Sequence, residues 1–289
     1  MANEVQVSKK VSHLMKNENV QERLKAMLDK NAESFVTSVI NTINGSAQLQ
    51  ICDPMTIVKS AMVAASLNLA VDPNLGFAAI VPYKDKNKGM QAQFQIMYKG
   101  LVQLAIRSGQ YETINVSEFY KDELDQYDPF TGEVTFRPHT EWKMRYEEGG
   151  EVVGYYAYFK LLTGFKKALY MTKEEVEKHA LTYSQSYKSD KAKGWTSSRW
   201  SQDFDAMGKK TVLKMLLSKF GVLSIEMQKA VTFDQSKVGG SIDNPEPAYV
   251  DNPEYEEKQE AINPFGTNQK ADEVEFSEED MPDFMKEGK

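Results

Sequence analysis

The sequence predicts an α+β fold with a helical N-terminal part, a central antiparallel sheet with hairpins, closing helices and a disordered acidic C-terminal tail. Apolar residues recur at helical spacing up to about residue 70 and again after Thr172. Between these regions they alternate with polar residues, as in β-strands. After Gln235 the apolar periodicity stops, and Gly, Pro, Asn, Glu and Gln dominate. Helices that precede and follow a block of strands favour an α+β domain.

The N-terminal region is expected to contain three helices. Apolar side chains recur through residues 20–28 and again through residues 35–43, with Gly45 as a stop. Asp53 followed by Pro54 is a favourable N-cap and first-turn pair. This pair predicts an alanine-rich helix that runs to Leu69 and packs closely against a neighbour.

A β-hairpin with a basic tip is predicted next. Residues 76–83 form an apolar run, and residues 91–98 alternate glutamine with apolar side chains. The turn between them carries Lys84, Lys86 and Lys88.

Residues 98–107 are then typical of a helix closed by Ser108 and Gly109. The side chains expected to be buried on this helix are Leu101, Val102, Ala105 and Ile106. Lys99, Gln103 and Arg107 stand four residues apart and should form one polar stripe.

The middle of the chain is expected to be rich in strands. The candidate strands are residues 113–119, 133–137, 142–146, 152–162 and 165–171. Hairpin turns are predicted at Gly149-Gly150 and at Thr163-Gly164.

The closing region is expected to be helical. Thr172 and Glu175 form a capping-box pattern that starts a helix. The polar stretch 184–194 interrupts the helical pattern. A long helix is predicted from about residue 195 to residue 220, interrupted near Gly208, followed by a short helix over residues 224–231.

The net charge of −7 hides an uneven distribution of charge. Residues 236–289 hold 15 acidic side chains and 5 lysines, whereas residues 1–235 hold 30 basic and 27 acidic side chains. Residues 160–219 alone hold 13 basic and 6 acidic side chains. Such asymmetry suggests a polyanionic partner, although a solvated lysine face gives the same pattern. We expect residues 1–235 to form the binding body and residues 236–289 to form a separate acidic tail.

Several classes of function lack their sequence motifs. The chain has neither a P-loop for ATP nor a Gly-x-Gly-x-x-Gly fingerprint. His13, His139 and His179 lack the spacing of metal ligands, and Cys52 is the single cysteine, expected to be inert. We therefore expect no cofactor and no structural metal. The absence of a long apolar run or a signal peptide predicts a cytoplasmic protein without a membrane partner.

One enzymatic alternative rests on Asp128, Glu141 and Lys143. Two carboxylates and a lysine could hold Mg²⁺ and activate water, as in a metal-dependent nuclease. Alternating Glu and Lys is also typical of an exposed strand face.

Single-stranded nucleic acid requires cations for its phosphates and flat surfaces for its bases. Residues 187–200 interleave both kinds of side chain, and Lys209, Lys210 and Lys214 follow. Together with the hairpin tip and the polar stripe, they could line a groove. The candidate DNA-binding residues are Lys84, Lys86, Lys88, Lys99, Arg107, Lys188, Lys191, Lys193, Trp195, Arg199, Trp200, Lys209, Lys210 and Lys214. The alternative is that both tryptophans belong to the core and that the lysines are simply solvated.

Three blocks of the chain, residues 62–83, 95–112 and 195–231, resemble the RecT/Red-beta family of phage single-strand DNA annealing proteins. The third block reads WTSSRWSQDFDAMGKKTVLKMLLSKFGVLSIEMQKAV and looks like the closing helices of that family. The sequence departs from the family at Lys214-Met215, where two adjacent arginines are common, and at Ala70, where glycine is common.

The resemblance implies binding and ATP-independent annealing of single-stranded DNA in phage homologous recombination, without enzymatic activity. It also implies rings or helical filaments on DNA and a 5′→3′ exonuclease partner, encoded by a phage or prophage in a bacterial cell. The DNA contacts that it implies are Lys99, Arg107, Lys209, Lys210 and Lys214. A protective coating protein, a structural assembly protein and the nuclease are the alternatives.

The acidic tail allows three interpretations: a solubilising linker, a competitor for the protein's own basic groove, or a partner-binding segment. The last interpretation rests on Asp280, Met281, Pro282, Asp283 and Phe284, which are similar to the acidic, phenylalanine-ended tip of bacterial single-strand binding proteins. A host protein of that class, or its partners, could therefore be bound here.

Overall fold

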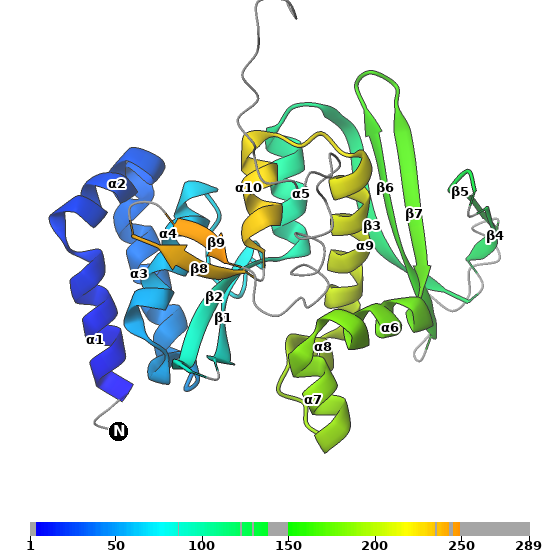
Figure 1. The fold of residues 1–289 in the computed structure, drawn as a ribbon. Helices are drawn as coiled ribbons and strands as arrows, with labels where there is room; N and C mark the ends of the chain where they lie inside the picture. Colours follow the sequence, from blue (N-terminus) through cyan, green and yellow to red (C-terminus); the bar gives the residue numbers. More distant parts are fainter. Residues whose placement is uncertain are drawn as a thin grey trace, which may run out of the picture. The chain divides into compact units, whose positions relative to one another are not determined.

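A computed structural model describes residues 4–85, 87–121, 123–128, 130–137, 150–234, 236–242 and 245–248 (Figure 1). Helices combine with antiparallel sheets, which confirms the predicted α+β class. The predicted strand at residues 142–146 and Gly149 of the predicted turn lie outside the described residues.

The N-terminal region is helical, as predicted. Its helices are α1 (Glu4–Met15), α2 (Glu18–Leu28), α3 (Ala32–Asn44) and α4 (Pro54–Ser66), joined by the short 3₁₀ turns Asp29–Asn31 and Leu49–Ile51. Helix α1 was not predicted. The Asp53 side chain accepts a hydrogen bond from the Met55 amide at 3.0 Å and caps α4. Helix α4 ends at Ser66 rather than at Leu69, and its buried face packs on α1, α2 and the following hairpin.

The predicted hairpin is present as β1 (Ala78–Asp85) and β2 (Gly89–Ile96), with Ala78 opposite Ile96. Helix α5 (Tyr98–Arg107) covers the predicted range. Gly109, which follows the helix, has a left-handed φ of 67°. The prediction for Ile106 was wrong, because this side chain is 54% exposed.

A three-stranded sheet follows, in the order β3-β6-β7. Its strands are β3 (Tyr111–Tyr120), β6 (Val152–Leu161) and β7 (Lys166–Thr172), and a separate hairpin is formed by β4 (Leu124–Asp128) and β5 (Glu133–Phe136). Strand β4 was not predicted. Phe119 of β3 stacks on Phe136 of β5, with ring centroids 5.5 Å apart.

The closing helices are α6 (Lys173–Tyr183), α7 (Gln185–Lys193), α8 (Arg199–Gln202), α9 (Phe204–Phe220) and α10 (Ile225–Phe233). The capping box at Thr172 and Glu175 is confirmed. The break in the long helix lies at Asp203 rather than at Gly208, because Asp203 leaves helical geometry and caps α9 through the Ala206 amide. Residues 185–193, within the stretch predicted as an interruption, form helix α7. The helix predicted from about residue 195 begins only at Arg199.

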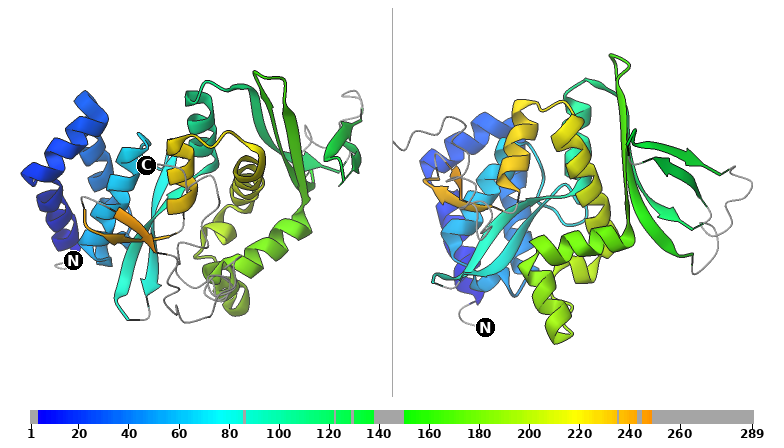
Figure 2. Two further views of the ribbon diagram at one scale, coloured as in Figure 1. Left: turned by 45° about the horizontal axis from the view of Figure 1, so that its top comes forward. Right: turned by 45° about the vertical axis from the view of Figure 1, so that its right-hand side comes forward.

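Helix α9 covers one face of the three-stranded sheet, and the β4–β5 hairpin lies on the other (Figures 1 and 2). Tyr155, Ala157 and Phe159 of β6 are fully buried. A side chain at Gly208 would come within 2.7 Å of the Tyr155 ring, so glycine is needed here for close packing.

A buried carboxylate, Asp234, joins three elements at the end of α10. Its Oδ1 accepts hydrogen bonds from Lys210 Nζ at 2.8 Å and from the Ile96 amide at 3.1 Å. Its Oδ2 accepts from Lys214 Nζ at 2.6 Å. The Asp234 carboxylate therefore links helix α9, helix α10 and strand β2.

The fold continues into the segment predicted as tail. Strands β8 (Lys237–Gly240) and β9 (Pro245–Ala248) pair antiparallel, and Lys59 Nζ donates to the Gly240 carbonyl at 2.6 Å. Ser236 and Val238 are buried. The described residues up to Ala248, β8 and β9 included, belong to one compact unit.

We predict that Asp234→Ala lowers the free energy of unfolding by about 3–5 kcal/mol, because it leaves two lysines without their carboxylate, one of them fully buried. Urea unfolding measures this loss. Glu112→Gln, which removes the solvent-exposed ion pair with Lys160, is the control and should change the midpoint little. Equal effects of the two substitutions would contradict the role given to Asp234.

We also predict that the position of a C-terminal truncation matters. A chain ending at Tyr249 should keep the thermal midpoint of the full chain. A chain ending at Gln235 loses the burial of Val238 and the Lys59 contact, and should be less stable by about 2 kcal/mol. Identical melting curves for the two truncated chains would show that β8 and β9 contribute nothing to stability.

Candidate nucleic-acid interface

Trp195 is a flat side chain among the basic residues of this region, and it is 55% exposed. It follows Gly194, whose left-handed φ of 68° ends α7 and turns the chain away from the helix. Lys193 Nζ lies 4.4 Å from the centroid of the Trp195 ring, within cation–π distance. A cation and an indole face are thus presented together at one turn.

Asp190 holds the segment that carries Trp195. The carboxylate is almost fully buried and accepts hydrogen bonds from Ser197 Oγ at 2.6 Å, the Ser198 amide at 2.7 Å and Ser201 Oγ at 2.7 Å. Burial raises the pKa of Asp190, but these hydrogen bonds outweigh it and hold the pKa below its ordinary value. The segment between α7 and α8 is therefore anchored to α7 by a charged acceptor.

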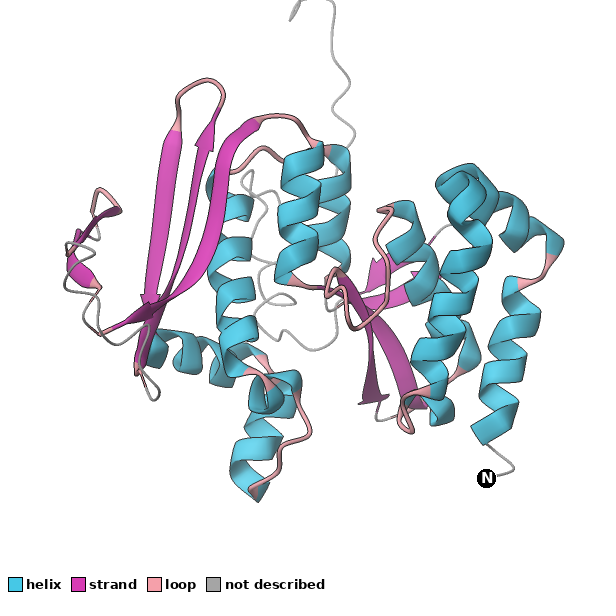
Figure 3. Cartoon of the chain, turned by 180° about the vertical axis from the view of Figure 1, so that it is seen from behind, coloured by secondary structure: helices cyan, strands magenta, loops and turns pink. Residues whose placement is uncertain are grey.

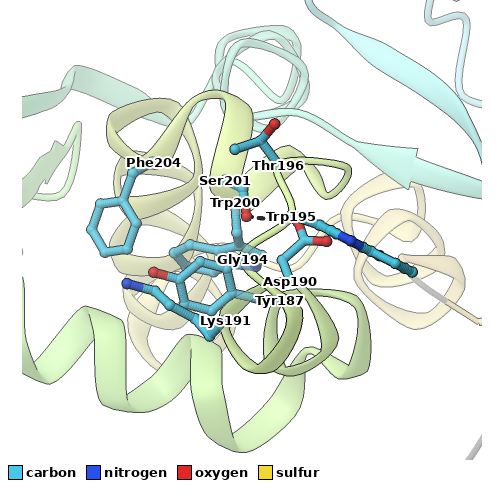
Figure 4. A pocket seen from close by; sticks show the side chains of 9 residues that line it. All are labelled: Tyr187, Asp190, Lys191, Gly194, Trp195, Thr196, Trp200, Ser201 and Phe204. Carbon is cyan, nitrogen blue, oxygen red and sulfur yellow. Dashed lines mark hydrogen bonds between the residues drawn. The ribbon is translucent and has the colours of Figure 1, made fainter.

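Three aromatic side chains, Tyr187, Trp200 and Phe204, pack together next to this segment (Figure 4). The ring of Trp200 lies 5.9 Å from Tyr187 and 5.4 Å from Phe204, measured between centroids. Trp200 is only 6% exposed, so it belongs to the core, whereas Trp195 does not. The sequence left both tryptophans undecided, and the structure separates them.

A pocket of about 400 Å³ lies beside these aromatic side chains. It is lined by Tyr187, Asp190, Lys191, Gly194, Trp195, Thr196, Trp200, Ser201 and Phe204 (Figure 4). Lys188, Lys193 and Arg199 are exposed on the same two helices and their connection. Lys191 is held by Glu177 at 2.7 Å and lies over the Tyr187 ring. An indole face, a concave apolar surface and cations thus coincide here, as single-strand binding requires.

The lysines of α9 are mostly engaged inside the protein. Lys209 Nζ pairs with Glu118 at 2.6 Å, and Lys214, 29% exposed in its side chain, pairs with Asp234. Lys210 is 2% exposed, and burial lowers its pKa to about 8 although Asp234 opposes the shift. We therefore leave Lys210, like Trp200, out of the surface that could touch DNA. Its spacing from the buried Met207 and Leu213 places it on the apolar stripe, a signal that the sequence analysis missed.

The remaining candidates fall on the hairpin and on α5. Lys84 and Lys88 are exposed at the tip of β1–β2, and Lys86 lies outside the described residues. The tip and helix α7 extend in the same direction (Figures 1 and 3). Arg107 donates from Nη2 to the Leu67 carbonyl at 2.7 Å, at the end of α4, so part of its function is to cap that helix. Lys99 is exposed on α5, the helix that carries Arg107.

Of the three residues of the nuclease alternative, the structure describes Asp128. Asp128 accepts hydrogen bonds from the Phe130 amide and the Thr131 hydroxyl within a turn, and Glu141 and Lys143 lie outside the described residues. Within the described ranges, no group of three or more histidine, cysteine or acidic side chains is placed to hold a metal ion. Among the same residues, no helix is long and apolar enough to span a bilayer.

Cys52, expected to be inert, is buried. Its Sγ donates toward the carbonyls of Gln48 and Gln91, and burial, reinforced by Asp53, raises its pKa to about 11. A thiol in this state is a poor nucleophile.

Comparison with known proteins gives a family model and relatives that match most of the chain. The model of the RecT family matches residues 33–250. Uncharacterized protein YqaK of Bacillus subtilis (strain 168) is 45% identical over 218 residues, which cover 75% of this chain and 69% of that protein. Protein RecT of Escherichia coli (strain K12) is 27% identical over 224 residues, which cover 76% of this chain and 78% of that protein.

The Asp190 anchor makes stability pH-dependent in acid. Because its pKa is lowered on folding, the contribution of Asp190 is present above about pH 3.9, the ordinary value, and is lost as the pH falls through the lower folded-state pKa. We predict that Asp190→Asn flattens the loss of stability below about pH 4. Thermal unfolding followed by tryptophan fluorescence at a series of pH values measures it, and parallel pH profiles for the two proteins would contradict the anchor.

Proposed function

Since the chain belongs to the RecT family, we propose that it binds single-stranded DNA without sequence preference and anneals complementary strands without ATP, as an oligomer on the DNA. Membership of this family supports single-strand annealing in recombination. The family is one of DNA-annealing proteins and is generally not enzymatic. The specific steps below are inferred from the site.

The observation that carries the proposal is the exposed Trp195 ring, anchored through Asp190 and accompanied by Lys193 and Arg199. An indole face can stack on any of the four bases, because every base has a π surface. Cations near the ring can neutralise phosphates without reading sequence. This combination favours a strand held by stacking and charge rather than by base-edge recognition.

Annealing follows from how such a strand is held. Phosphate neutralisation reduces the repulsion between two polyanions, while bases that are not stacked on protein keep their pairing edges free. A correct second strand then gains pairing and stacking that a mismatched strand lacks. An oligomer places many weak sites along one strand, so avidity makes binding tight without sequence readout.

The partners are proposed on the same basis. The binding body, residues 1–235, binds DNA and other copies of the chain. A 5′→3′ exonuclease supplies the single strands. The acidic segment is proposed to contact a protein partner, such as the host single-strand binding protein. This segment comprises Asp280, Met281, Pro282, Asp283 and Phe284. The reaction takes place in the cytoplasm of a bacterium that carries the phage or prophage.

We predict that the protein accelerates pairing of two complementary fluorescent oligonucleotides without ATP. The acceleration should fade between about 50 mM and about 200 mM salt, because each neutralised phosphate releases counterions. Slower pairing despite tight binding would identify a coating protein. Strand cleavage with Mg²⁺ that is lost in Glu141→Gln would identify a nuclease.

We predict that Trp195→Ala weakens binding of a short single strand roughly five- to 150-fold, the range expected for one lost stacking contact. Trp195→Phe should retain part of the affinity, because a ring remains. Fluorescence anisotropy at fixed salt measures both. Lys25→Ala with Lys30→Ala, which removes exposed charges from the N-terminal helices, is the control and should bind as the wild type does. Full affinity in Trp195→Ala would exclude base stacking at this residue.

A further inference from the structure

Large apolar side chains from three segments lie exposed at one end of the described structure. The segments are the end of α5, the turn between β6 and β7, and the connection from α9 to α10, which lie at the top of Figure 1. We call these side chains the end patch, and each of them is more than 40% exposed: Ile106, Leu162, Phe165, Phe220, Leu223 and Ile225. Exposed apolar residues that gather in this way are typical of an interaction surface.

Hydrogen bonds and ring contacts hold the three segments together. The Leu162 amide donates to the Gln110 carbonyl at 3.0 Å, and the Val222 amide donates to the Tyr111 hydroxyl at 2.8 Å. The buried Phe159 ring lies 5.5 Å from the Tyr111 ring and 5.9 Å from the Phe165 ring of the patch. The end patch is therefore formed before any partner arrives, so binding does not have to order its segments first.

The end patch has a basic border. Arg107, Lys166 and Lys219 are exposed, and each is the sequence neighbour of a patch residue. Glu226 interacts electrostatically with Arg107, but in the described part of the chain no carboxylate forms an ion pair with either of the two lysines. The border therefore keeps a positive charge that a partner can neutralise.

Two other occupants fit this surface less well. A second copy of the chain offers the apolar groove between α1 and α4, but Lys9 and Lys10 line that groove, so two basic surfaces would meet. Single-stranded DNA stacks its bases on rings, whereas four of the six patch residues are aliphatic. Of the two rings, Phe220 already lies under Lys167 Nζ, which is 5.4 Å from the ring centroid.

We propose that the end patch binds an acidic segment of a partner protein in which aspartate or glutamate residues are interspersed with large apolar side chains. The apolar side chains of that segment cover the patch, which removes apolar surface of both proteins from water. Its carboxylates meet Lys166 and Lys219 at the border, which favours an acidic segment over a neutral or basic one. The end patch adds a protein-binding surface to the proposed function and does not depend on it, because Trp195 and Arg199 lie on other elements.

The test measures binding of a short labelled peptide, in which glutamate alternates with leucine, to the full-length protein by fluorescence anisotropy. We expect saturable binding that Ile225→Asp weakens at least about tenfold, because the substitution removes an apolar contact and adds a repulsive charge. The matched control is Phe130→Asp, at a residue that is 97% exposed in the turn between β4 and β5, and it should bind as the wild type does. Thermal melting establishes that both variants are folded.

The contribution of charge is tested at the border. Lys166→Glu with Lys219→Glu should weaken peptide binding severalfold, whereas Lys25→Glu with Lys30→Glu, at exposed lysines of the N-terminal region, should leave it unchanged. A peptide in which lysine alternates with leucine should not bind. If the acidic peptide does not bind, or if both peptides bind equally well, the proposal is wrong.

Two further results would assign the end patch to another occupant and overturn the proposal. Displacement of the peptide by a short oligonucleotide would identify a nucleic-acid site. Loss of assembly in Ile225→Asp, measured by light scattering, would identify a contact between copies. Trp195→Ala should bind the peptide as the wild type does, and failure of the wild type to anneal DNA would overturn the proposed function while the peptide result stands.

Discussion

The fold depends on one buried carboxylate. Asp234 takes two lysines from α9 and one backbone amide from β2, and it stands at the last turn of α10. Burial raises the pKa of this carboxyl, but the two ammonium groups outweigh burial and hold it below its ordinary value. The N-terminal hairpin and the closing helices are thereby fixed to each other, although they lie more than a hundred residues apart in sequence. This contact acts together with the packing of α9 on the three-stranded sheet and of both helices on α5.

The same contact changes how the charge of the protein should be counted. Lysines at 209, 210 and 214 look like a phosphate-binding row in the sequence, yet Glu118 and Asp234 neutralise them within the fold. Near Trp195, the side chains of Lys188, Lys193 and Arg199 are exposed, and Lys191 is exposed but paired with Glu177. A small number of open cations per copy favours weak individual sites, so tight binding has to come from repetition along the strand.

Features with a local cause could be predicted from the sequence. The Asp53-Pro54 start of α4, the capping box of α6, the β1–β2 hairpin and the span of α5 all depend on residues within a few positions of each other. Features set by distant contacts could not. Helix α7 was predicted as an interruption, because its stability comes from hydrogen bonds between Asp190 and serines beyond its end. Gly208 was predicted as a break, because the close packing of Tyr155 against it depends on a residue far away in the sequence. The burial of Lys210 could be predicted from its helical spacing, but its partner Asp234, 24 residues away, could not.

Annealing also limits how strongly each copy should hold DNA. A site that gripped every base would protect a strand and prevent its pairing, whereas a site with one exposed ring and few cations leaves most bases unstacked from protein. Weak sites act together only if neighbouring copies are held in a repeating arrangement, which a heterologous contact provides and an isologous one does not. For the proposed function, one exposed ring per copy favours a reversible contact with DNA, and repetition of copies along the strand makes the sum of the contacts strong enough to hold it.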